Sequence, residues 1–399
     1  MAIINVNCSN PSTVQTALNN AAPSDTIQCN ATSSLNWTSK VTLPNNKNIT
    51  FDGNNCILSG TNWILSIPST ASYYARVTRV TFRGSGLVDF GGGGSPTLPP
   101  QNLHPVTNKP WRIDHCTFDG TNSDTNAIAN AQGPGLIDHC NWIHIPAAKE
   151  TIWNGGPDNS WSDVITPGNP EGAVFIEDCT MSSSQYEQLG TGLWSASSVM
   201  HSFRGARVVL RHSTLYGIML DCHGNYYNPP STRWWEAYEN TLTNSIFCFR
   251  GGSGIVFNNH GTGSQGSNIY FVDEAANSST DNGIGKGQVV SGANIYMPIY
   301  IWNNTGPSYE YNTDGCSTHI GTVNWGHDVI QASSGITLPT TCSSTPNPQG
   351  FWKTDENILY KCTAPNTWTK YYIPYTYPHP LQNLETCPPV IASFNLQVL

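Results

Sequence analysis

Charged side chains are scarce in this sequence, and their scarcity excludes several classes of protein. Asp, Glu, Lys and Arg together make up 11% of the 399 residues, where about a quarter is usual. Stable helices draw on Glu, Lys and Leu, so this composition argues against a helical protein. The 17 Lys and Arg are outnumbered by 26 Asp and Glu and form no basic stripe, which makes nucleic acid a poor partner.

Long apolar runs and metal-binding cysteine pairs are also missing. No eighteen consecutive residues are apolar, so we expect no membrane-spanning helix. The Cys-x-x-Cys spacing of zinc sites does not occur. The composition also argues against a disordered chain, because burial of 13 Trp, 17 Tyr and 12 Phe supplies a large stabilising energy. The 36 Gly and 27 Pro instead favour short strands joined by many turns.

One short phrase returns along the middle of the chain. Residues Ile113–Phe118 read apolar, polar, polar, small, small, apolar. Four later copies follow the same pattern, at Ile137–Trp142, Ile176–Met181, Leu210–Leu215 and Ala237–Leu242. Counted at the fourth position, the gaps are 24, 39, 34 and 27 residues. A fixed phrase on a variable period indicates a solenoid, in which each rung buries its apolar face by stacking on its neighbours.

The two ends of the chain have the composition of caps. Ser12–Ala22 predicts a helix, with Ser12 as N-cap and an apolar stripe that includes Val14 and Leu18. At the other end, residues 359–362 and 367–372 predict a hairpin, and we expect the Pro-rich segment 371–380 to lie across the last rung as a lid. We therefore assign residues 1–349 to the solenoid with its first cap, and 350–399 to a capping segment packed on it.

The 12 cysteines are many for a reducing compartment and predict a secreted or cell-surface protein. Cys116, Cys140 and Cys179 share the fourth position of the phrase, so stacking would place them about 4.8 Å apart. That spacing suits a ladder of buried thiols and also lies within the range for a disulfide. For the remaining cysteines we expect the bridges Cys8–Cys29, Cys222–Cys248, Cys316–Cys342 and Cys362–Cys387.

Two segments, Val14–Leu18 followed by Ser24–Ile27 and Trp111–His115, resemble parts of a known superfamily. The first resembles the usual opening of the right-handed parallel β-helix proteins related to pectate lyases, and the second resembles their Trp-Ile-Asp-His phrase. The resemblance covers roughly residues 12–305. It implies an all-β, single-domain right-handed parallel β-helix that acts on carbohydrate, although this fold hosts lyases, hydrolases, esterases and adhesins. The Arg-x-Pro-x-x-Arg catalytic segment of pectate lyases is absent, which argues against ordinary pectate lyase activity.

The second position of the phrase suggests a metal site. If the apolar first positions point inward, alternation turns Asp114, Asp138 and Glu177 outward in one column, with Arg211 on the next rung. Adjacent carboxylates repel unless something compensates them. A Ca²⁺ ion would do so, and the resemblance implies Ca²⁺ held against a uronate sugar. An arginine would also compensate, and the acids could simply hold neighbouring loops.

A second constellation concentrates chemistry in residues 201–250. We predict Arg211 or Arg204 to neutralise a uronate or act as base, and His223, oriented by Asp221, to transfer a proton. Arginines suit the acid groups of a glycan, and aromatic rings suit sugar faces. The predicted substrate-binding residues are Arg250, His201, Tyr226, Trp234, Trp235 and Glu236. The alternative is a set of ion pairs that tie loops to the rungs.

These observations favour an extracellular polysaccharide lyase that cleaves an acidic, uronate-containing glycan by β-elimination. A glycoside hydrolase is the first alternative, with Asp221 and Glu236 as its pair of carboxylates. The second alternative is a non-catalytic glycan-binding or structural surface protein. In each case we expect a polysaccharide partner and a monomer.

Overall fold

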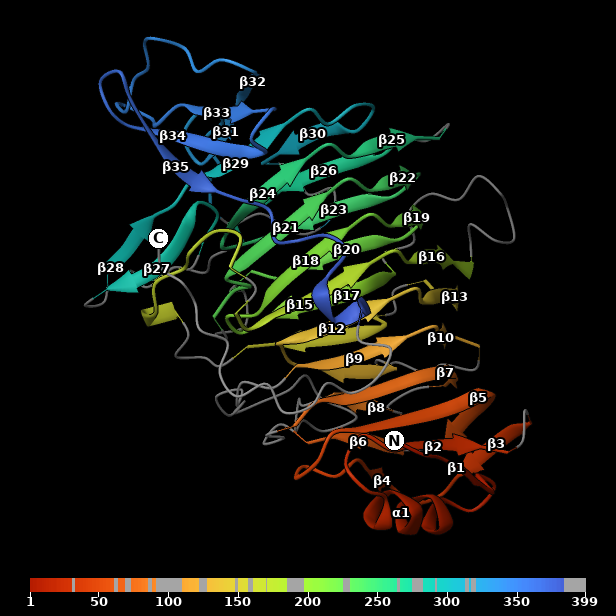
Figure 1. The fold of residues 1–399 in the computed structure, drawn as a ribbon. Helices are drawn as coiled ribbons and strands as arrows, with labels where there is room; N and C mark the ends of the chain where they lie inside the picture. Colours follow the sequence, from red (N-terminus) through yellow and green to blue (C-terminus); the bar gives the residue numbers. More distant parts are fainter. Residues whose placement is uncertain are drawn as a thin grey trace.

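The computed structural model describes residues 1–30, 33–60, 64–68, 73–84, 88–90, 110–121, 128–147, 150–156, 161–169, 171–184, 197–224, 230–263, 266–274, 283–290, 293–312, 316 and 321–383. Two long parallel sheets dominate it, as Figure 1 shows. Strands from successive turns of the chain lie side by side in each sheet. This arrangement is a parallel β-helix, which confirms the predicted solenoid.

The larger sheet, sheet A, has 19 strands in two adjoining columns. The first column contains β1 (Ile3–Val6), β2 (Thr26–Cys29), β5 (Ile49–Gly60), β7 (Ala75–Arg83), β9 (Trp111–Asp114), β12 (Gly135–Asp138), β15 (Ala173–Glu177), β18 (Arg207–Arg211), β21 (Trp234–Tyr238), β24 (Ser253–Phe257), β29 (Ile299–Trp302) and β31 (Val329–Gln331). The long β5 and β7 extend into the second column. It also holds β3 (Ser34–Trp37), β10 (Thr117–Asp119), β13 (Asn141–Ile145), β16 (Thr180–Ser183), β19 (Thr214–Tyr216), β22 (Thr241–Thr243) and β25 (His260–Thr262).

The second sheet, sheet B, has ten strands and closes the other side of the solenoid. Its strands are β4 (Val41–Thr42), β6 (Leu65–Ile67), β8 (Val88–Phe90), β11 (Ala129–Ala131), β14 (Ile152–Gly155), β17 (Ser198–Phe203), β20 (Met219–Cys222), β23 (Ile246–Phe249), β26 (Asn268–Phe271) and β30 (Ser308–Tyr311). A hairpin of β27 (Lys286–Val290) and β28 (Ala293–Tyr296) projects between β26 and β29 in the chain.

The repeated phrases stack in register, as the sequence predicted. Ile137 pairs with Ile113 on one side and Ile176 on the other. Leu210 and then Ala237 continue the same inward column. All five of these side chains are fully buried in one core that runs the length of the solenoid. Apolar burial along this column is therefore what joins the rungs into one body.

The fourth position of the phrase forms a hydrogen-bonded ladder at the turn between the two columns of sheet A. In each rung a backbone N–H donates to the side chain of the next. The chain of acceptors is Cys140 Sγ (3.3 Å), Cys179 Sγ (3.4 Å), Ser213 Oγ (3.2 Å), Asn240 Oδ1 (3.0 Å), Asn259 Oδ1 (3.1 Å) and Asn304 Oδ1 (3.0 Å). Because these N–H groups are buried, each needs such an acceptor.

The cysteines of this ladder are free, and three of the four expected bridges are wrong, because Cys222 is a free thiol and Cys316 and Cys362 have other partners. Cys116, Cys140 and Cys179 are buried thiols, and Cys8–Cys29 is a disulfide, as predicted. The other disulfides are Cys248–Cys316 and Cys342–Cys362, and Cys222 is a buried free thiol. Cys222 turns into the core from β20, so it cannot reach the outward Cys248. Cys387 lies outside the described residues.

Helix α1 (Pro11–Asn20) covers the first rung and confirms the predicted N-terminal cap. Its N-cap is Asn10, two residues before the expected Ser12, and the Oδ1 of Asn10 accepts the N–H of Ser12 at 2.9 Å. Val14 and Leu18 are buried against the core, as the apolar stripe indicated. No helix of the described residues is long and apolar enough to cross a membrane.

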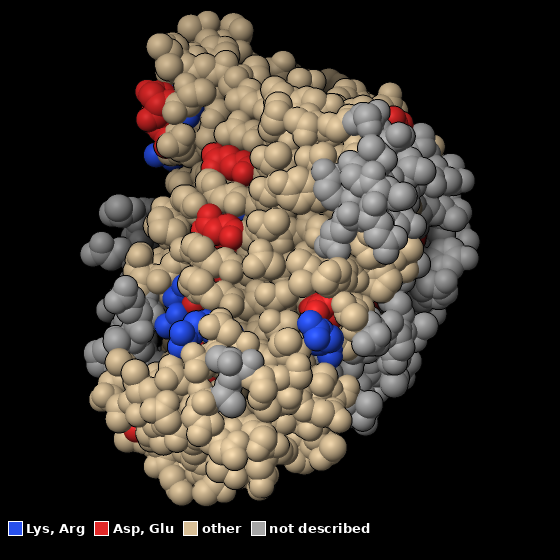
Figure 2. All heavy atoms as spheres, turned by 90° about the vertical axis from the view of Figure 1, so that its right-hand side faces the viewer, with Lys and Arg blue, Asp and Glu red and all other residues tan. Residues whose placement is uncertain are grey.

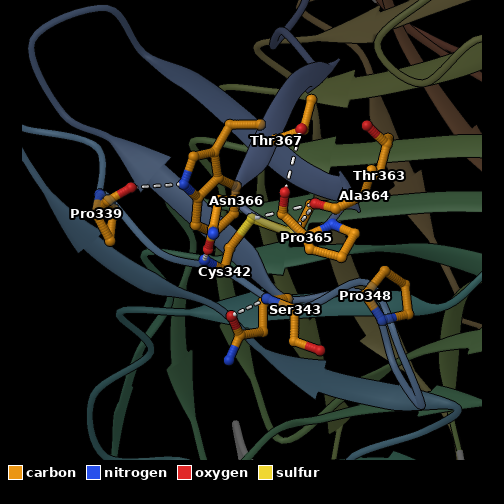
Figure 3. The surroundings of a disulfide bond; sticks show 12 residues. Pro339, Cys342, Ser343, Pro348, Thr363, Ala364, Pro365, Asn366 and Thr367 are labelled. Atoms are coloured by element: carbon orange, nitrogen blue, oxygen red, sulfur yellow. Dashed lines mark hydrogen bonds between the residues drawn. A yellow bond between two sulfur atoms is a disulfide. The ribbon is translucent and has the colours of Figure 1, made fainter.

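The C-terminal part forms a small sheet of β32 (Ser333–Gly335), β33 (Gly350–Lys353), β34 (Ile358–Ala364) and β35 (Thr367–Tyr372). Its β34–β35 hairpin confirms the prediction. Figure 3 shows the disulfide of Cys342 in this region, where the N–H of Cys342 donates to Asn366 Oδ1 at 3.1 Å. The sheet packs on the outer face of sheet A, where Trp352 stacks on Trp302.

Residues 371–383, here called the strap, run from β35 along the outer face of sheet A to the 3₁₀ helix η2 (Pro380–Asn383). Figure 1 shows the strap crossing β21, β18 and β15. The predicted lid therefore exists but lies along the side of the solenoid, not across its last rung. The hydroxyl group of Tyr372 donates to Glu236, and the carbonyl oxygen of Tyr375 accepts from Arg211. These hydrogen bonds to sheet A hold the strap in its place.

The right-hand side of the molecule in Figure 1, where the second column of sheet A lies, carries few charges on its described surface. Figure 2 shows isolated acidic and basic groups on a mostly uncharged surface there. The second column of sheet A presents a row of neutral polar side chains in register, at Thr117, Asn141, Thr180, Thr214 and Thr241. The scarcity of charge in the sequence thus reflects strands whose outward positions are filled by Thr and Asn.

Candidate functional site

The predicted carboxylate column on sheet A exists, but arginines neutralise it. Asp138 pairs in register with Asp114 and Glu177, and Glu177 pairs with Arg211. Arg76 donates two hydrogen bonds to Asp114, at 2.8 and 2.5 Å. Arg112 likewise donates two hydrogen bonds to Asp138, each of 2.8 Å. Arg211 forms an ion pair with Glu177 at 2.5 Å. Arginine compensates this column, as one of the sequence alternatives allowed.

A calcium ion does not fit these acids as they stand. The imidazoles of His115 and His139 add a contact each at 2.9 Å to Asp114 and Asp138. The second oxygen of Glu177 accepts from the strap, at 2.8 Å from the His379 N–H and 2.6 Å from Gln382 Nε2. All three carboxylates are fully buried. Within the described ranges, no group of three His, Cys, Asp or Glu residues could hold a metal ion.

Four predicted site residues of sheet A are sealed from solvent. Arg211 is fully buried and donates to the strap carbonyls of residues 375 and 376, at 2.7 and 2.9 Å. Glu236 accepts from Tyr372 at 2.7 Å and from Trp234 Nε1 at 2.8 Å, and its burial raises its pKa. Trp235 points into the core and stacks on a phenylalanine. Trp234, which we also predicted to bind substrate, is 2% exposed because the C-terminal part covers this face of sheet A.

The other predicted residues meet on sheet B. His201 on β17 pairs in register with Asp221 on β20, and both side chains point outward. His223 follows Asp221 by two positions and Arg250 follows β23, so they lie on the same side. Two acids that the sequence analysis missed complete the group, Glu150 before β14 and Glu274 after β26. We call these six residues the histidine cluster.

The two imidazoles of the cluster are neighbours. The ring centroids of His201 and His223 lie 4.8 Å apart, with 13% of each side chain exposed. His201 Nδ1 contacts Glu150 Oε1 at 2.6 Å and Asp221 Oδ2 at 3.3 Å. Because both contacts are carboxylates, which accept hydrogen bonds, Nδ1 carries a proton. A second proton on Nε2 gives the charged form of the ring.

The tautomer of His223 follows from its surroundings. Its Nδ1 lies 2.9 Å from the carbonyl oxygen of Gly224 and 3.2 Å from Glu274 Oε2. Both groups only accept hydrogen bonds, so Nδ1 is the protonated nitrogen. The lone pair of the neutral ring is then on Nε2. That atom has the character of a general base.

Arg250 fixes the acids of the cluster. It donates to both oxygens of Asp221, at 2.9 and 2.6 Å, and to Glu274 Oε1 at 2.8 Å. Glu274 Oε2 in turn accepts the N–H of Gly224 at 3.0 Å. Arg250 is 8% exposed. In this arrangement Arg250 orients the carboxylates that face the two histidines, rather than reaching out for substrate.

The cluster shifts its two histidines in opposite directions. Burial together with the positive charges of Arg250 and His201 lowers the pKa of His223 to about 4. Burial also acts against the charged form of His201, but the charges of Glu150 and Asp221 outweigh it and raise the pKa of His201 above 6.5. Glu150 stays ionised, since His201 outweighs its burial and lowers its pKa to about 2. At neutral pH His223 is therefore neutral, while the raised pKa of His201 keeps its charged form to a higher pH than in a free imidazole.

The sequence prediction grouped residues that the fold separates. Arg211 and His223 are close in the chain, yet one lies on sheet A and the other on sheet B. The hydrolase pair of Asp221 and Glu236 is separated in the same way. Arg204 follows β17 with a φ of 55° and is partly buried. Its catalytic role stays a prediction. Tyr226 lies outside the described residues.

Comparisons with known proteins give limited information. No protein-family model and no curated protein matches the chain. Among solved structures, it is similar to an alginate lyase from Paenibacillus sp. str. FPU-7, with 13% identity, a TM-score of 0.38, and 78% of this chain and 99% of that chain covered. It is also similar to a mannuronic acid specific polysaccharide family 6 lyase from human gut microbiota, with 15% identity, a TM-score of 0.31, and coverages of 79% and 84%. These TM-scores are too low to carry an inference about function.

Proposed function

We propose that this chain is an extracellular polysaccharide lyase that cleaves a uronate-containing glycan by β-elimination at the histidine cluster. One observation carries the proposal: His201 and His223 are partly exposed neighbours whose pKa values are shifted apart. A neutral imidazole beside a charged one supplies the base and the acid that an elimination needs. The three disulfides among the described residues suit an oxidising, extracellular location.

The reaction assigns one role to each ring. His223 Nε2 takes the proton from the carbon next to the uronate carboxyl group. The electron pair of that C–H bond forms the new carbon–carbon double bond, and the glycosidic carbon–oxygen bond breaks. His201 Nε2–H, held in its charged form by Glu150 and Asp221, gives its proton to the leaving oxygen. The charge of His201 also favours the negative charge that develops on the carboxyl group.

The acids of the cluster support elimination over hydrolysis. A glycoside hydrolase needs one carboxyl group that is protonated near neutral pH. Glu150 has a pKa lowered to about 2 and cannot serve as that acid. Both Asp221 oxygens are bonded to Arg250. Glu236 has a raised pKa, but it lies on sheet A beneath Tyr372.

The direct test is to identify the products from uronate polymers. Elimination leaves unsaturated ends that absorb ultraviolet light, whereas hydrolysis leaves reducing ends without that absorbance. We expect wild-type protein to produce the absorbance, and His223→Gln to reduce its rate about a thousandfold because the base is lost. His260→Gln is the matched control, since His260 is an exposed histidine of β25 on sheet A.

Three results would contradict the proposal. Reducing ends without ultraviolet absorbance would identify a hydrolase. No cleavage of any polymer in a broad panel would favour the non-catalytic glycan-binding role. Equal rates for wild-type protein and a folded His223→Gln variant would leave elimination possible but remove it from the histidine cluster.

A further inference from the structure

Trp153 is a buried indole on the outer face of sheet B, beside the histidine cluster. It lies on β14 and pairs in register with His201 on β17. Its side chain is 6% exposed and packs with Phe203 in a small apolar cluster apart from the main core. The ring of Phe203 meets the His201 ring edge-on, with the centroids 5.5 Å apart. Strands β14 and β17 therefore place two aromatic side chains next to His201.

The indole of Trp153 bonds to the acid that faces His201. Its Nε1–H donates to Oε2 of Glu150, three residues earlier in the chain. The other oxygen of this carboxylate, Oε1, contacts His201 Nδ1 at 2.6 Å. Because each oxygen has a different partner, the bond to Trp153 fixes the orientation in which the carboxylate meets the imidazole.

Glu150 depends on this bond more than the other acids of the cluster would. Arg250 forms ion pairs with Asp221 and Glu274, at 2.6 and 2.8 Å. No lysine or arginine among the described residues forms an ion pair with Glu150, and 35% of its side chain is exposed. Without the indole, the carboxylate is free to rotate toward water and gains conformational freedom by doing so.

The chemical type of the partner matters as well. An indole N–H is neutral and only donates, so it orients a carboxylate without cancelling its charge, as the guanidinium of Arg250 does for Asp221. Burial acts most strongly against the charged form of His201, and the charge of Glu150 is the largest that raises its pKa, ahead of Asp221, while Arg250 lowers it. His223 is a further titratable neighbour, with its ring centroid 4.8 Å away.

We propose that Trp153 is a positioning residue of the site, which holds Glu150 against His201 through a neutral hydrogen bond. The inference rests on the proposed function for its effect on cleavage, whereas its effect on the titration of His201 does not. Trp153→Phe keeps an aromatic ring in place and removes the Nε1–H. Glu150 then turns away from His201 in part of the molecules, so the pKa of His201 falls toward 6.5.

The experiment titrates ring-labelled histidines by NMR in wild-type protein and in Trp153→Phe. We expect a lower pKa for His201 in the variant. At alkaline pH, where loss of the His201 proton limits the rate, kcat/KM on a uronate polymer falls about fivefold, but it stays within about twofold of wild type at acid pH. Trp37→Phe is the matched control, because the buried Trp37 indole of β3 donates to the carbonyl oxygen of Cys8 at 2.8 Å. It loses an indole hydrogen bond without moving the His201 titration.

A double-mutant cycle with Glu150→Gln separates positioning from a general disturbance of the fold. In the Glu150→Gln background, Trp153→Phe has no further effect on the His201 pKa, because the charge that it positions is absent. An equal shift in both backgrounds, or no shift in folded Trp153→Phe, would overturn the positioning role. A shifted titration without any cleavage of uronate polymers would support the positioning role and refute the proposed function alone.

A measurement that leaves Trp153 intact covers the case in which Trp153→Phe does not fold. The Trp153 N–H donates to a charged acceptor, and such hydrogen bonds are shorter and stronger than those to neutral groups. Glu150→Gln substitutes a neutral acceptor, so it moves the indole proton resonance of Trp153 upfield and leaves that of Trp37 in place. An unmoved Trp153 resonance would show that the indole does not hold Glu150.

Discussion

The chemistry of the candidate site depends on two side chains of one residue type. His201 and His223 have the same intrinsic pKa, and their partners separate them. The carboxylates of Glu150 and Asp221 raise the pKa of His201, whereas burial and the charges of Arg250 and His201 lower the pKa of His223. Two neighbouring titratable groups whose pKa values are shifted in opposite directions are a recurring feature of acid–base catalysis.

The pH dependence of cleavage tests this separation. The base must be neutral, so activity rises with pH through the His223 pKa of about 4. The acid must be protonated, so activity falls at a pH above 6.5, where His201 loses its proton. We expect a bell-shaped profile of kcat/KM with these two limbs.

Glu150→Gln moves the alkaline limb most. It removes the largest charge that favours protonated His201, so the alkaline limb shifts to lower pH, while the acid limb shifts less and in the same direction because Glu150 also interacts with His223. Steady-state kinetics across the pH range measure both limbs. A profile without an acid limb near pH 4, or an unchanged alkaline limb in Glu150→Gln, would contradict the roles of the two histidines.

At the scale of strands and turns, the sequence predicted sheet A well and sheet B poorly. The phrase around Ile113 repeats because each rung needs an inward apolar residue followed by a turn, so its register could be derived. The strands of sheet B share no repeated sequence. Which of their residues become neighbours therefore depends on the lengths of the loops between the strands. Glu150 and Glu274 therefore gave no signal in the sequence, although they contact the predicted His201 and His223.

The repeated phrase indicated only part of the hydrogen-bonded ladder at the turns. Its fourth position changes from Cys to Ser to Asn along the solenoid, and each type accepts the N–H of the rung before it. The preceding residue adopts a left-handed conformation, as at His139, with φ 51°, and Glu239, with φ 56°. The sequence showed small side chains at this position but not the continuous bonding between rungs.

Asn240→Ala tests the contribution of the ladder to stability. The change leaves the buried N–H of Ser213 and the carbonyl group of Leu210 without the bonds that Asn240 makes at 3.0 and 2.9 Å. We expect the free energy of unfolding to fall by about 3 kcal/mol. Denaturant unfolding measures it, with the exposed Thr180→Ala as the control expected within about 0.5 kcal/mol of wild type. Equal losses in the two variants would show that the ladder adds little.

For the whole molecule, the strap decides which face is available to a ligand. It occupies the outer face of sheet A, where it satisfies Arg112 and Arg211 with backbone carbonyls. The sequence could not predict this placement, because the contacts join residues more than 160 positions apart and involve backbone atoms. Sheet B keeps a partly exposed polar cluster, so the two faces of the solenoid differ in what they leave open to a ligand.

The most direct test of the central claim is a crystal structure of His223→Gln with a bound uronate oligosaccharide. We predict the sugar on the outer face of sheet B, with a glycosidic oxygen near His201 and a uronate ring against the substituted position. Oligosaccharide bound instead at the strap on sheet A, with the histidine cluster vacant, would contradict the proposed site.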